Sequence, residues 1–447
     1  MLKLIIPDKY TILSSKWHYV IDHFNSVYKL TSDISIAYGE ASDGAYLSVK
    51  PGEEVLDFFR AAQPVLKNYT MHNWKGQKLP LLFNSGNGPE IVTESHKGIT
   101  INYDIVASAF YFLSSWQEWH SQDKDKYGRF PAESHLLYKL DCLKIPVVNY
   151  YFDILAEAII KTGITGISLR NEKMQTLVTH DIDECMTGWG YNAFWYLKNF
   201  QVLKSLEMVL RKVFHKDIWF NFDKIMEIEE KMGISATYFF LPSNKKTGNI
   251  KNADYNIKSK KIEMTINDLI RKGHEIGIHG SFGTGLNNQR FETEILEFDH
   301  EINGGRFHYL AINLPKTFEI LEQSGLKYDS SMGFARFIGF RNGYCYPYYP
   351  YNITLDIPFK FLEFPLMIMD ITLENEQYMN CAVDTALDAV IPLIEEVGKF
   401  NGTLNLLWHN KFFSGYKSGW GKVFVDLIRR LKENDIKFIQ FKDCIKP

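Results

Sequence analysis

The feature that most constrains the fold is an alternation of strand-like and helix-like segments that runs from Met174 to the end of the chain. The strand-like segments are TLVTHD, SATYFFL, HEIGIH, RFHYL, LKYDSS, FLEFPLMI, TLNLLWH and IKFIQF, with helical patterns between them. Such alternation is typical of parallel sheets whose strands are joined by helices. We therefore expect about eight parallel strands after residue 165, with a long helical insertion that ends at Val213.

Polar side chains stand at the carboxyl ends of several of these strand-like segments. They are Asp181, Asp183, His279, Arg306, His308 and His409. In a (β/α) barrel the strand ends on this side surround the active site, so their distribution favours a barrel over an open sheet. The sequence therefore predicts an α/β chain whose larger part is a (β/α) barrel over residues 166–447.

These strand-end residues are of the types that bind a divalent metal and transfer protons. Asp181 and Asp183 are two residues apart, so their side chains point the same way in a strand. One carboxylate can then bind a metal while the other stays free as a base. Carboxylate and imidazole ligands suit zinc or a similar divalent cation, which polarises a carbonyl and lowers the pKa of bound water.

Residues 1–165 show a different sequence pattern, with short β-like runs and aromatic helical stretches. SAFYFLSSWQEWH reads as a helix, DKDKYGRFPAES as an exposed loop, and PVVNYYFDILAEAIIKTG as a helix that stops at Gly163. A length of 447 residues also favours two domains over one. We expect a smaller α/β domain over residues 1–165, which either shapes the cleft of the barrel or mediates association.

The overall composition argues against several classes of partner. The formal net charge is −3, so no basic field favours nucleic acid or an anionic membrane as a partner. Five scattered cysteines lack any CxxC spacing, which favours a reducing compartment over a disulfide framework. The sequence shows no signal-peptide pattern and no run near the roughly 20 apolar residues of a spanning helix. We expect a soluble, cytoplasmic protein without a membrane span, although an export route that bypasses such signals stays open, and the oligomeric state is left undetermined.

Four motifs, THDID, HEIGIHGS, RFHYL and LLWH, occur in this order along the chain. Together they resemble the polysaccharide deacetylases of the carbohydrate esterase type, including a bacterial subgroup with an extra N-terminal domain. The resemblance covers about residues 174–447. It implies a distorted (β/α) barrel of the polysaccharide deacetylase type, preceded by the smaller α/β domain.

The resemblance also implies a role for each residue that falls on a motif. Asp181 would be the general base and Arg306 the cation that orients it, since a nearby cation favours the charged form of a carboxylate. Asp183 and His279 would bind the metal. His409 would be the acid that protonates the leaving group.

One position departs from the family pattern. The family has a second histidine four residues after the first, and Gly283 stands there in this chain. His308, two residues after Arg306 at a neighbouring strand end, could supply the missing ligand. Ser281 or water could also fill the gap, or else no metal binds and activity is lost.

Each of these residues also has a structural interpretation. The two aspartates could cap the following helix, because aspartate favours N-cap positions. Arg306 could serve only as an ion-pair partner, and His308 and His409 could be hydrogen-bonded histidines of the sheet. His180 is expected to face the opposite side of its strand and to be structural.

Further candidates for substrate binding lie in and near an aromatic-rich segment. YDSSMGFARFIGFRNGYCYPYYPY contains Asp329 and Arg341, and it could form a sugar-facing wall or a packed loop. Asp370 ends the strand-like FPLMIMD, where it could support His409 or bind substrate. Together with Ser281, these residues form the predicted substrate-binding set.

The hypothesis that best fits these features is a metal-dependent hydrolase that removes an N-acetyl or O-acetyl group from an amino sugar or glycan precursor. Zinc is the expected metal, with manganese or cobalt as alternatives. The resemblance and the missing export pattern imply a bacterial role in surface polysaccharide biosynthesis. Two other hypotheses stay open: a degenerate barrel that binds carbohydrate without catalysis, supported by Gly283, and hydrolysis of another C–N bond such as that of a cyclic imide.

Overall fold

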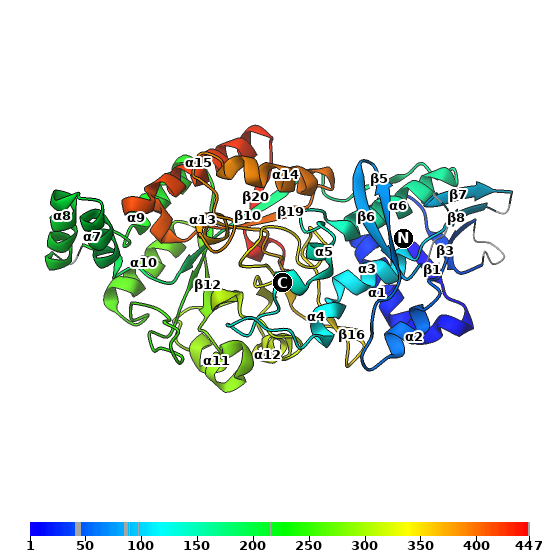
Figure 1. The fold of residues 1–447 in the computed structure, drawn as a ribbon, viewed down its shortest axis with the longest axis horizontal. Coiled ribbons are helices and arrows are strands. Elements are labelled where there is room, and N and C mark those ends of the chain that lie inside the picture. The colour runs from blue at the N-terminus through cyan, green and yellow to red at the C-terminus, as the bar shows by residue number, and fades with distance from the viewer. Residues whose placement is uncertain (41–45, 85–87, 89, 97, 215, 446–447) are drawn as a thin grey trace.

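The computed structural model describes residues 1–445 except 41–45, 85–87, 89, 97 and 215. Two α/β regions lie side by side along the long axis of the molecule, and a helical hairpin projects from the far end of the larger region (Figure 1). The larger region is built from the residues after Met174 and the smaller one from the N-terminal residues. This arrangement confirms the predicted α/β class and the parallel sheet of the larger region.

A sheet of nine strands forms the larger region. The strands are β10 (Gln175–Ile182), β11 (Thr237–Phe240), β12 (Glu275–Gly280), β13 (Gly304–Phe307), β14 (Tyr328–Asp329), β17 (Leu362–Glu363), β18 (Ile368–Met369), β19 (Thr403–Leu407) and β20 (Lys437–Ile439). Their order is β17-β14-β13-β12-β11-β10-β19-β18, β20 also pairs with β10, and all neighbours run parallel. Along the described chain the two end strands do not pair with each other, so the curled sheet is an open, distorted barrel.

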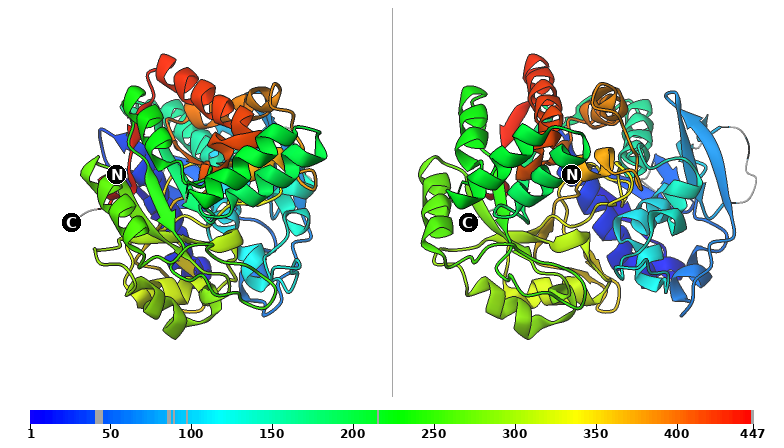
Figure 2. Two further views of the ribbon diagram at one scale, coloured as in Figure 1. Left: turned by 90° about the vertical axis from the view of Figure 1, so that its left-hand side faces the viewer. Right: turned by 60° about the vertical axis from the view of Figure 1, so that its left-hand side comes forward.

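Amphipathic helices cover the outside of this sheet (Figures 1 and 2). They are α9 (Phe222–Lys231), α10 (Lys260–Arg271), α11 (Asn288–Ile295), α12 (Lys316–Ser324), α14 (Ala386–Lys399) and α15 (Ser418–Glu433). In α10 the buried residues Ile262, Ile266 and Leu269 recur at intervals of four and three, so they form one apolar stripe. The hydrophobic periodicity of α10 therefore determines which of its faces is buried.

The helical insertion predicted before Val213 is a hairpin of two helices, α7 (Gly188–Lys198) and α8 (Val202–Val213). The two helices pack on each other and stand out from one end of the barrel (Figure 1). None of the described helices has the length and apolar character needed to cross a membrane.

Two strand-like segments differ from the continuous strands that the sequence predicted. FLEFPLMI contains β17 and β18, which lie at opposite ends of the strand order; Pro365 between them has no N–H for a strand ladder. In RFHYL the strand ends at Phe307, and Tyr309 and Leu310 have positive φ values of 65° and 52°. The chain therefore turns away from the sheet directly after Phe307.

The N-terminal region is built on a five-stranded sheet. Its strands are β1 (Leu2–Ile5), β3 (Ile34–Tyr38), β4 (Leu47–Val49), β7 (Val92–Ser95) and β8 (Gly98–Ile101), in the order β1-β3-β4-β8-β7. Only the pair of β7 and β8 is antiparallel within this sheet as described. The other elements are α1 (Ser14–Val27), α2 (Val55–Arg60), α3 (Ile105–Leu113), α4 (Trp116–His120), α5 (Leu136–Lys139), α6 (Val147–Lys161), and the antiparallel pair β5 (Tyr69–Trp74) and β6 (Gln77–Leu82).

The two regions are packed firmly against each other. β9 (Ile167–Leu169), directly after the expected boundary, pairs antiparallel with β2 (Tyr28–Leu30) of the N-terminal region. Arg341 of the barrel binds the buried Glu118 of α4 with an Nη2–Oε1 distance of 2.5 Å. One cluster of buried hydrophobic residues extends through both regions. Burial and paired charges therefore hold the N-terminal region in a fixed position on the barrel.

Candidate metal centre and active site

A cavity of about 500 Å³ opens at the carboxyl ends of the parallel strands. Asp181 and Asp183 reach it from the end of β10, His279 from β12, His308 from the turn after β13, and His409 from the chain after β19. The structure thus brings together the side chains that the sequence predicted as base, acid and metal ligands. Their distances and hydrogen bonds indicate what each can do chemically.

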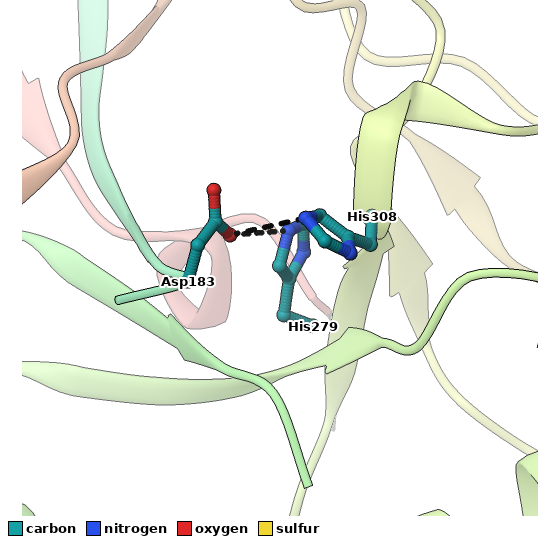
Figure 3. A group of neighbouring side chains, drawn as sticks. All are labelled: Asp183, His279 and His308. Carbon is teal, nitrogen blue, oxygen red and sulfur yellow. Dashed lines mark ion pairs between the residues drawn. The ribbon is translucent and has the colours of Figure 1, made fainter. Parts of the chain in front are cut away.

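Asp183, His279 and His308 form a compact group in this cavity (Figure 3). One ligand atom from each residue lies within 4.8 Å of the other two. Asp183 Oδ1 is 3.3 Å from His279 Nε2 and 3.6 Å from His308 Nε2, and Figure 3 shows both imidazoles directed at this carboxylate. Carboxylate oxygen and imidazole nitrogen are ligands that zinc and similar divalent cations accept.

Hydrogen bonds hold the two imidazoles with their Nε2 atoms toward Asp183. His279 Nδ1 lies 2.8 Å from the carbonyl oxygen of Arg306, which can only accept, so Nδ1 carries the proton. His308 Nδ1 lies 3.3 Å from Asn252 Oδ1, which also accepts the backbone N–H of Phe282 at 2.9 Å. Nε2 is then the free nitrogen of each ring, as in histidines that proteins orient for metal binding.

The electrostatics of this group fit a divalent cation. Asp183 Oδ1 is buried and has no hydrogen-bond donor of good geometry among the described residues. Burial acts to raise the pKa of Asp183, but His308, His279 and His409 outweigh it and lower that pKa well below its usual value. Burial lowers the pKa of His308 to about 3. A carboxylate with a free buried oxygen beside two imidazoles is a donor set that a cation satisfies.

His279 adds a nitrogen for which a proton and a cation compete. Burial acts to lower the pKa of His279, but the carboxylates of Asp181 and Asp183 outweigh it, so the pKa is raised. A metal ligand must give up this proton, and metal binding therefore releases it. The two nearby carboxylates favour positive charge at this point, whether a proton or a metal ion supplies it.

Arg306 lies behind Asp181 and fixes the orientation of that carboxylate. Its Nη1 donates to Asp181 Oδ1 at 2.8 Å and to Thr179 Oγ1 at 2.9 Å. Its Nε and Nη2 donate to the carbonyl and hydroxyl oxygens of Ser330, both at 2.8 Å. Asp181 Oδ2 is left facing His279, 3.6 Å from Nε2. One carboxylate oxygen is thus bound to arginine and the other is directed toward the candidate metal group.

Asp370 fixes His409 by two hydrogen bonds. Asp370 Oδ1 accepts from His409 Nδ1 at 2.7 Å, and Oδ2 accepts from the backbone N–H of His409 at 2.5 Å. His409 Nε2 lies 3.5 Å from Asp183 Oδ2 at the cavity wall. Asp370 is fully buried and is not among the described residues that line the cavity. The geometry therefore favours support of His409 over contact with substrate.

The missing second histidine of the HEIGIHGS motif has a local explanation. Gly283 follows β12 with a φ of +89°, in the left-handed region that favours glycine over histidine. The second imidazole near Asp183 comes instead from His308 at the neighbouring strand end. Of the alternatives left open by the sequence, this geometry agrees with replacement by His308.

The other predicted substrate-binding residues lie outside the described cavity wall, and the side chains of Arg341 and Asp329 have partners in the protein. Arg341 donates from Nε and Nη2 to the two carboxylate oxygens of Glu118 at 3.1 and 2.5 Å. Asp329 accepts hydrogen bonds from the backbone and hydroxyl of Ser331 at 2.8 and 3.0 Å. The N–H of Ser281 donates to a glutamate of α11 at 2.9 Å. The segment around Asp329 and Arg341 is therefore packed, and the alternative of a sugar-facing wall has no support at these two residues.

The cavity also contains residues that the sequence did not single out. Lys411 stands two residues after His409, and its Nζ is 4.0 Å from Glu184 Oε2. Burial acts to lower the pKa of Lys411, but Asp183 and Glu184 outweigh it and raise the pKa. The only sequence signal was its position, since an isolated lysine after a strand is usually a solvated residue.

The N-terminal region supplies part of the cavity wall through Tyr127 and Arg129. Arg129 Nη1 donates to the carbonyl oxygen of Tyr309 at 2.7 Å, and the rings of Tyr127 and Tyr309 lie 4.8 Å apart. The segment DKDKYGRFPAES was expected to be an exposed loop, yet Arg129 is only 7% exposed because it pairs with Asp125 and reaches the barrel. This contact joins segments far apart in sequence, so no local pattern signals it.

Comparison with known families covers only the N-terminal region. A family of unknown function (DUF7033) matches residues 10–163. No curated protein matches the chain at a significant level.

Solved structures with similarity to this chain include deacetylase-type proteins. A candidate polysaccharide deacetylase from Mycobacterium smegmatis has 13% identity and a TM-score of 0.40, over 62% of this chain and 91% of that one. A CE4 esterase from Streptococcus mutans has 14% identity and a TM-score of 0.34, over 60% and 87%. A CE4 family pseudoenzyme from Bacillus anthracis has 10% identity and a TM-score of 0.32, over 61% and 66%. These values are too low to assign an activity, which has to come from the geometry of the cavity.

Proposed function

We propose that this protein is a metal-dependent hydrolase that removes an acetyl group from an amino sugar or glycan precursor. The observation that carries the proposal is the convergence of three groups on one cavity. These groups are the Asp183, His279 and His308 cluster, the pair of Asp181 with Arg306, and the pair of His409 with Asp370. A base, an acid and a cation site around one cavity are the parts that hydrolysis of an acyl group requires.

Asp183 Oδ1 and the Nε2 atoms of His279 and His308 would hold the metal. When bound, a divalent cation supplies a Lewis acid that polarises the acyl carbonyl and increases the acidity of water. Zinc suits this set of one carboxylate and two imidazoles, and manganese or cobalt are alternatives.

Asp181 and His409 would move the protons. Asp181 Oδ2 takes a proton from the attacking water, while Arg306 holds the other oxygen of the carboxylate at 2.8 Å. His409 Nε2 gives a proton to the departing amine or alkoxide, and Asp370 fixes the ring through Nδ1. Each proton-transfer group thus has one bound atom and one atom directed to the cavity, as acid–base catalysis requires.

The cavity has the size and lining of a site for a small polar ligand. Its volume of about 500 Å³ falls within the usual range for small-molecule sites. Four tyrosines line the wall, Tyr127, Tyr191, Tyr309 and Tyr378. Tyrosines of this kind can stack on a sugar ring and bond its hydroxyl groups, which supports an acetylated sugar as substrate.

The test combines metal analysis of the purified full chain with measurement of acetate release. The substrates are a panel of N-acetylated and O-acetylated sugars, with a cyclic imide as comparison. We expect a stoichiometric divalent metal and acetate release, and loss of both in Asp183→Ala. The matched control is Asp104→Asn, which changes a buried aspartate of the N-terminal region outside the described cavity wall and is expected to keep metal and activity.

Three results would contradict the proposal. A chain that takes up no metal under any loading condition, yet binds glycan, would be a degenerate barrel. A chain that opens the imide without releasing acetate would hydrolyse another C–N bond. Equal metal loss in Asp183→Ala and Asp104→Asn would mean that the metal is not held at this group.

A further inference from the structure

The hairpin of α7 and α8 is anchored to the barrel at its base. The backbone N–H of Tyr416 donates to Asn192 Oδ1 at 3.0 Å, and the rings of Trp195 and Tyr416 stack at 5.1 Å. Tyr191 stacks on Trp219 at 5.2 Å. The backbone N–H of Trp189 also donates to Asp217 Oδ2 at 3.0 Å, and the far end of the hairpin stands clear of the barrel in Figure 1. Its orientation is therefore fixed while most of its surface is left uncovered.

The uncovered surface of the hairpin is apolar. Phe200 at the tip is 93% exposed and Leu203 is 83% exposed. The other exposed apolar residues of this surface are Phe194, Leu197, Val202, Leu206, Val209, Leu210, Val213 and Phe214. Isolated exposed apolar residues are ordinary, but a contiguous set of this kind marks an interaction surface.

The apolar stripe of α8 faces solvent because its other face packs on α7. Met208 is only 3% exposed, and Ser205 Oγ donates to the carbonyl of Ala193 in α7 at 2.9 Å. Leu203, Leu206 and Leu210 recur at helical intervals on the opposite side, where they are more than half exposed. In α10 a stripe of the same periodicity is buried against the sheet. The stripe of α8 has the same spacing, but no apolar surface among the described residues covers it.

The hairpin also carries an excess of positive charge. Residues 188–216 contain five lysines and arginines, Lys198, Lys204, Arg211, Lys212 and Lys216, against one acidic residue, Glu207. Glu207 pairs with Arg211 at 2.9 Å and leaves the four lysines in excess. The whole chain has a formal net charge of −3, so this positive charge is local to the hairpin.

We propose that the hairpin docks on the surface of an anionic lipid bilayer. An exposed apolar face with Phe and Leu in a hairpin that also carries several lysines is the composition of helices that lie in the membrane interface. Helices of 12 residues or fewer, as α7 and α8 are, fit that position, since a spanning helix needs about 20 residues. A second copy of the chain is the less favoured occupant, because pairing this face with itself would bring the lysines of two hairpins together. The inference goes beyond the proposed hydrolysis and does not depend on it.

Co-sedimentation of the full chain with vesicles tests the inference. The vesicles contain phosphatidylglycerol and phosphatidylcholine in equal amounts, with pure phosphatidylcholine as comparison. We expect binding to the anionic vesicles that salt weakens. The double variant Leu203→Glu with Leu210→Glu should lower the partition coefficient at least about tenfold, because two apolar anchors are replaced by charges. Lys204→Glu with Lys212→Glu should lower it about tenfold on anionic vesicles only.

The matched control is Leu296→Glu, which places the same charge at an 81% exposed leucine of the barrel outside the hairpin. It should bind vesicles like the natural chain, and all variants should keep its thermal transition because the changed residues are exposed. A chain that stays in the supernatant at every lipid concentration would overturn the inference. So would equal binding by the hairpin variant, or a dimer that Leu203→Glu separates in the absence of any vesicle binding.

Discussion

The N-terminal region and the barrel each place an aspartate just beyond a strand, and the two carboxylates have opposite surroundings. Asp104, between β8 and α3, is the N-cap of α3 and accepts the N–H of Ala107 at 2.9 Å. It also accepts from Gly52 N–H at 2.8 Å and from the hydroxyl of Tyr38. All its partners are neutral, so burial dominates and raises the pKa of Asp104 to about 6.

Asp183, after β10, is only partly buried, is surrounded by imidazoles and has a lowered pKa. Its neighbour Asp181 is bound to Arg306. The comparison shows that an acid at the end of a strand is not by itself a sign of chemistry, since Asp104 has the capping role that was the structural alternative for Asp181 and Asp183. The distinguishing feature is the convergence of basic groups from several strands.

The largest expected effect concerns Asp181, the proposed base. Asp181→Asn should lower kcat for acetate release by about 10² to 10⁴, because the amide cannot accept the proton. The metal content should stay unchanged, since Asp181 is not one of the three proposed ligands. Steady-state kinetics with metal analysis of the same sample checks both. A rate within about threefold of the natural chain would remove Asp181 from the base role.

Substitution of Asp104 should lower the free energy of unfolding, whereas substitution of Asp181 should lower kcat. Asp104→Ala removes an N-cap and leaves the Tyr38 hydroxyl and the Gly52 N–H without their acceptor. We expect a loss of about 3 kcal/mol in the free energy of unfolding. Denaturant titration measures it, with Asp104→Asn as the milder variant. A loss below about 0.5 kcal/mol would mean that the cap is dispensable.

Substitution of Asp370 tests whether this buried carboxylate affects kcat through its hydrogen bond to His409. Asp370→Asn should lower kcat by about tenfold to hundredfold, less than loss of the proton-transfer group itself. The effect should shrink for an acetyl ester with a phenolic leaving group, which departs without a proton. An equal loss for both kinds of substrate would assign Asp370 a purely structural role.

The smallest expected effect is a pH dependence of stability from Asp104. Its pKa of about 6 in the folded chain lies above the usual value of 3.8, so the folded state binds the proton more strongly. The stabilisation is complete below about pH 4 and is lost as the pH rises through about 6. Between about pH 5 and pH 7 the natural chain should lose about 1 kcal/mol relative to Asp104→Asn, measured by paired denaturant titrations. A difference that does not change with pH would contradict the raised pKa.

Much of the fold follows from local patterns, and the rest depends on contacts that no local pattern records. The alternation after Met174 predicted the parallel sheet, and spacing at the strand ends predicted the residues that meet in the cavity. The split of FLEFPLMI agrees with Pro365, which has no N–H for a strand ladder. The periodicity of α8 predicted a helix and could not show that its apolar stripe faces solvent.

The positions of the cavity residues were predictable only in part for the same reason. Asp370 reaches His409 because β18 and β19 are neighbours in the sheet, a pairing that the sequence does not state. Arg129 reaches Tyr309 from the other region of the chain. Arg341 was predicted to bind substrate, and only the fold shows that it pairs with Glu118 between the two regions, whereas Arg306 binds Asp181 beside the cavity.

Arg306 takes part in both halves of the candidate site through different atoms. Its guanidinium binds Asp181, while its backbone carbonyl accepts the proton of His279 Nδ1. A substitution at this position deletes the first bond and retains the second, because every amino acid has the same carbonyl. A single substitution can therefore separate the two contacts. A variant such as Arg306→Met would keep the backbone hydrogen bond that orients His279 and would lose the side-chain bond that holds Asp181.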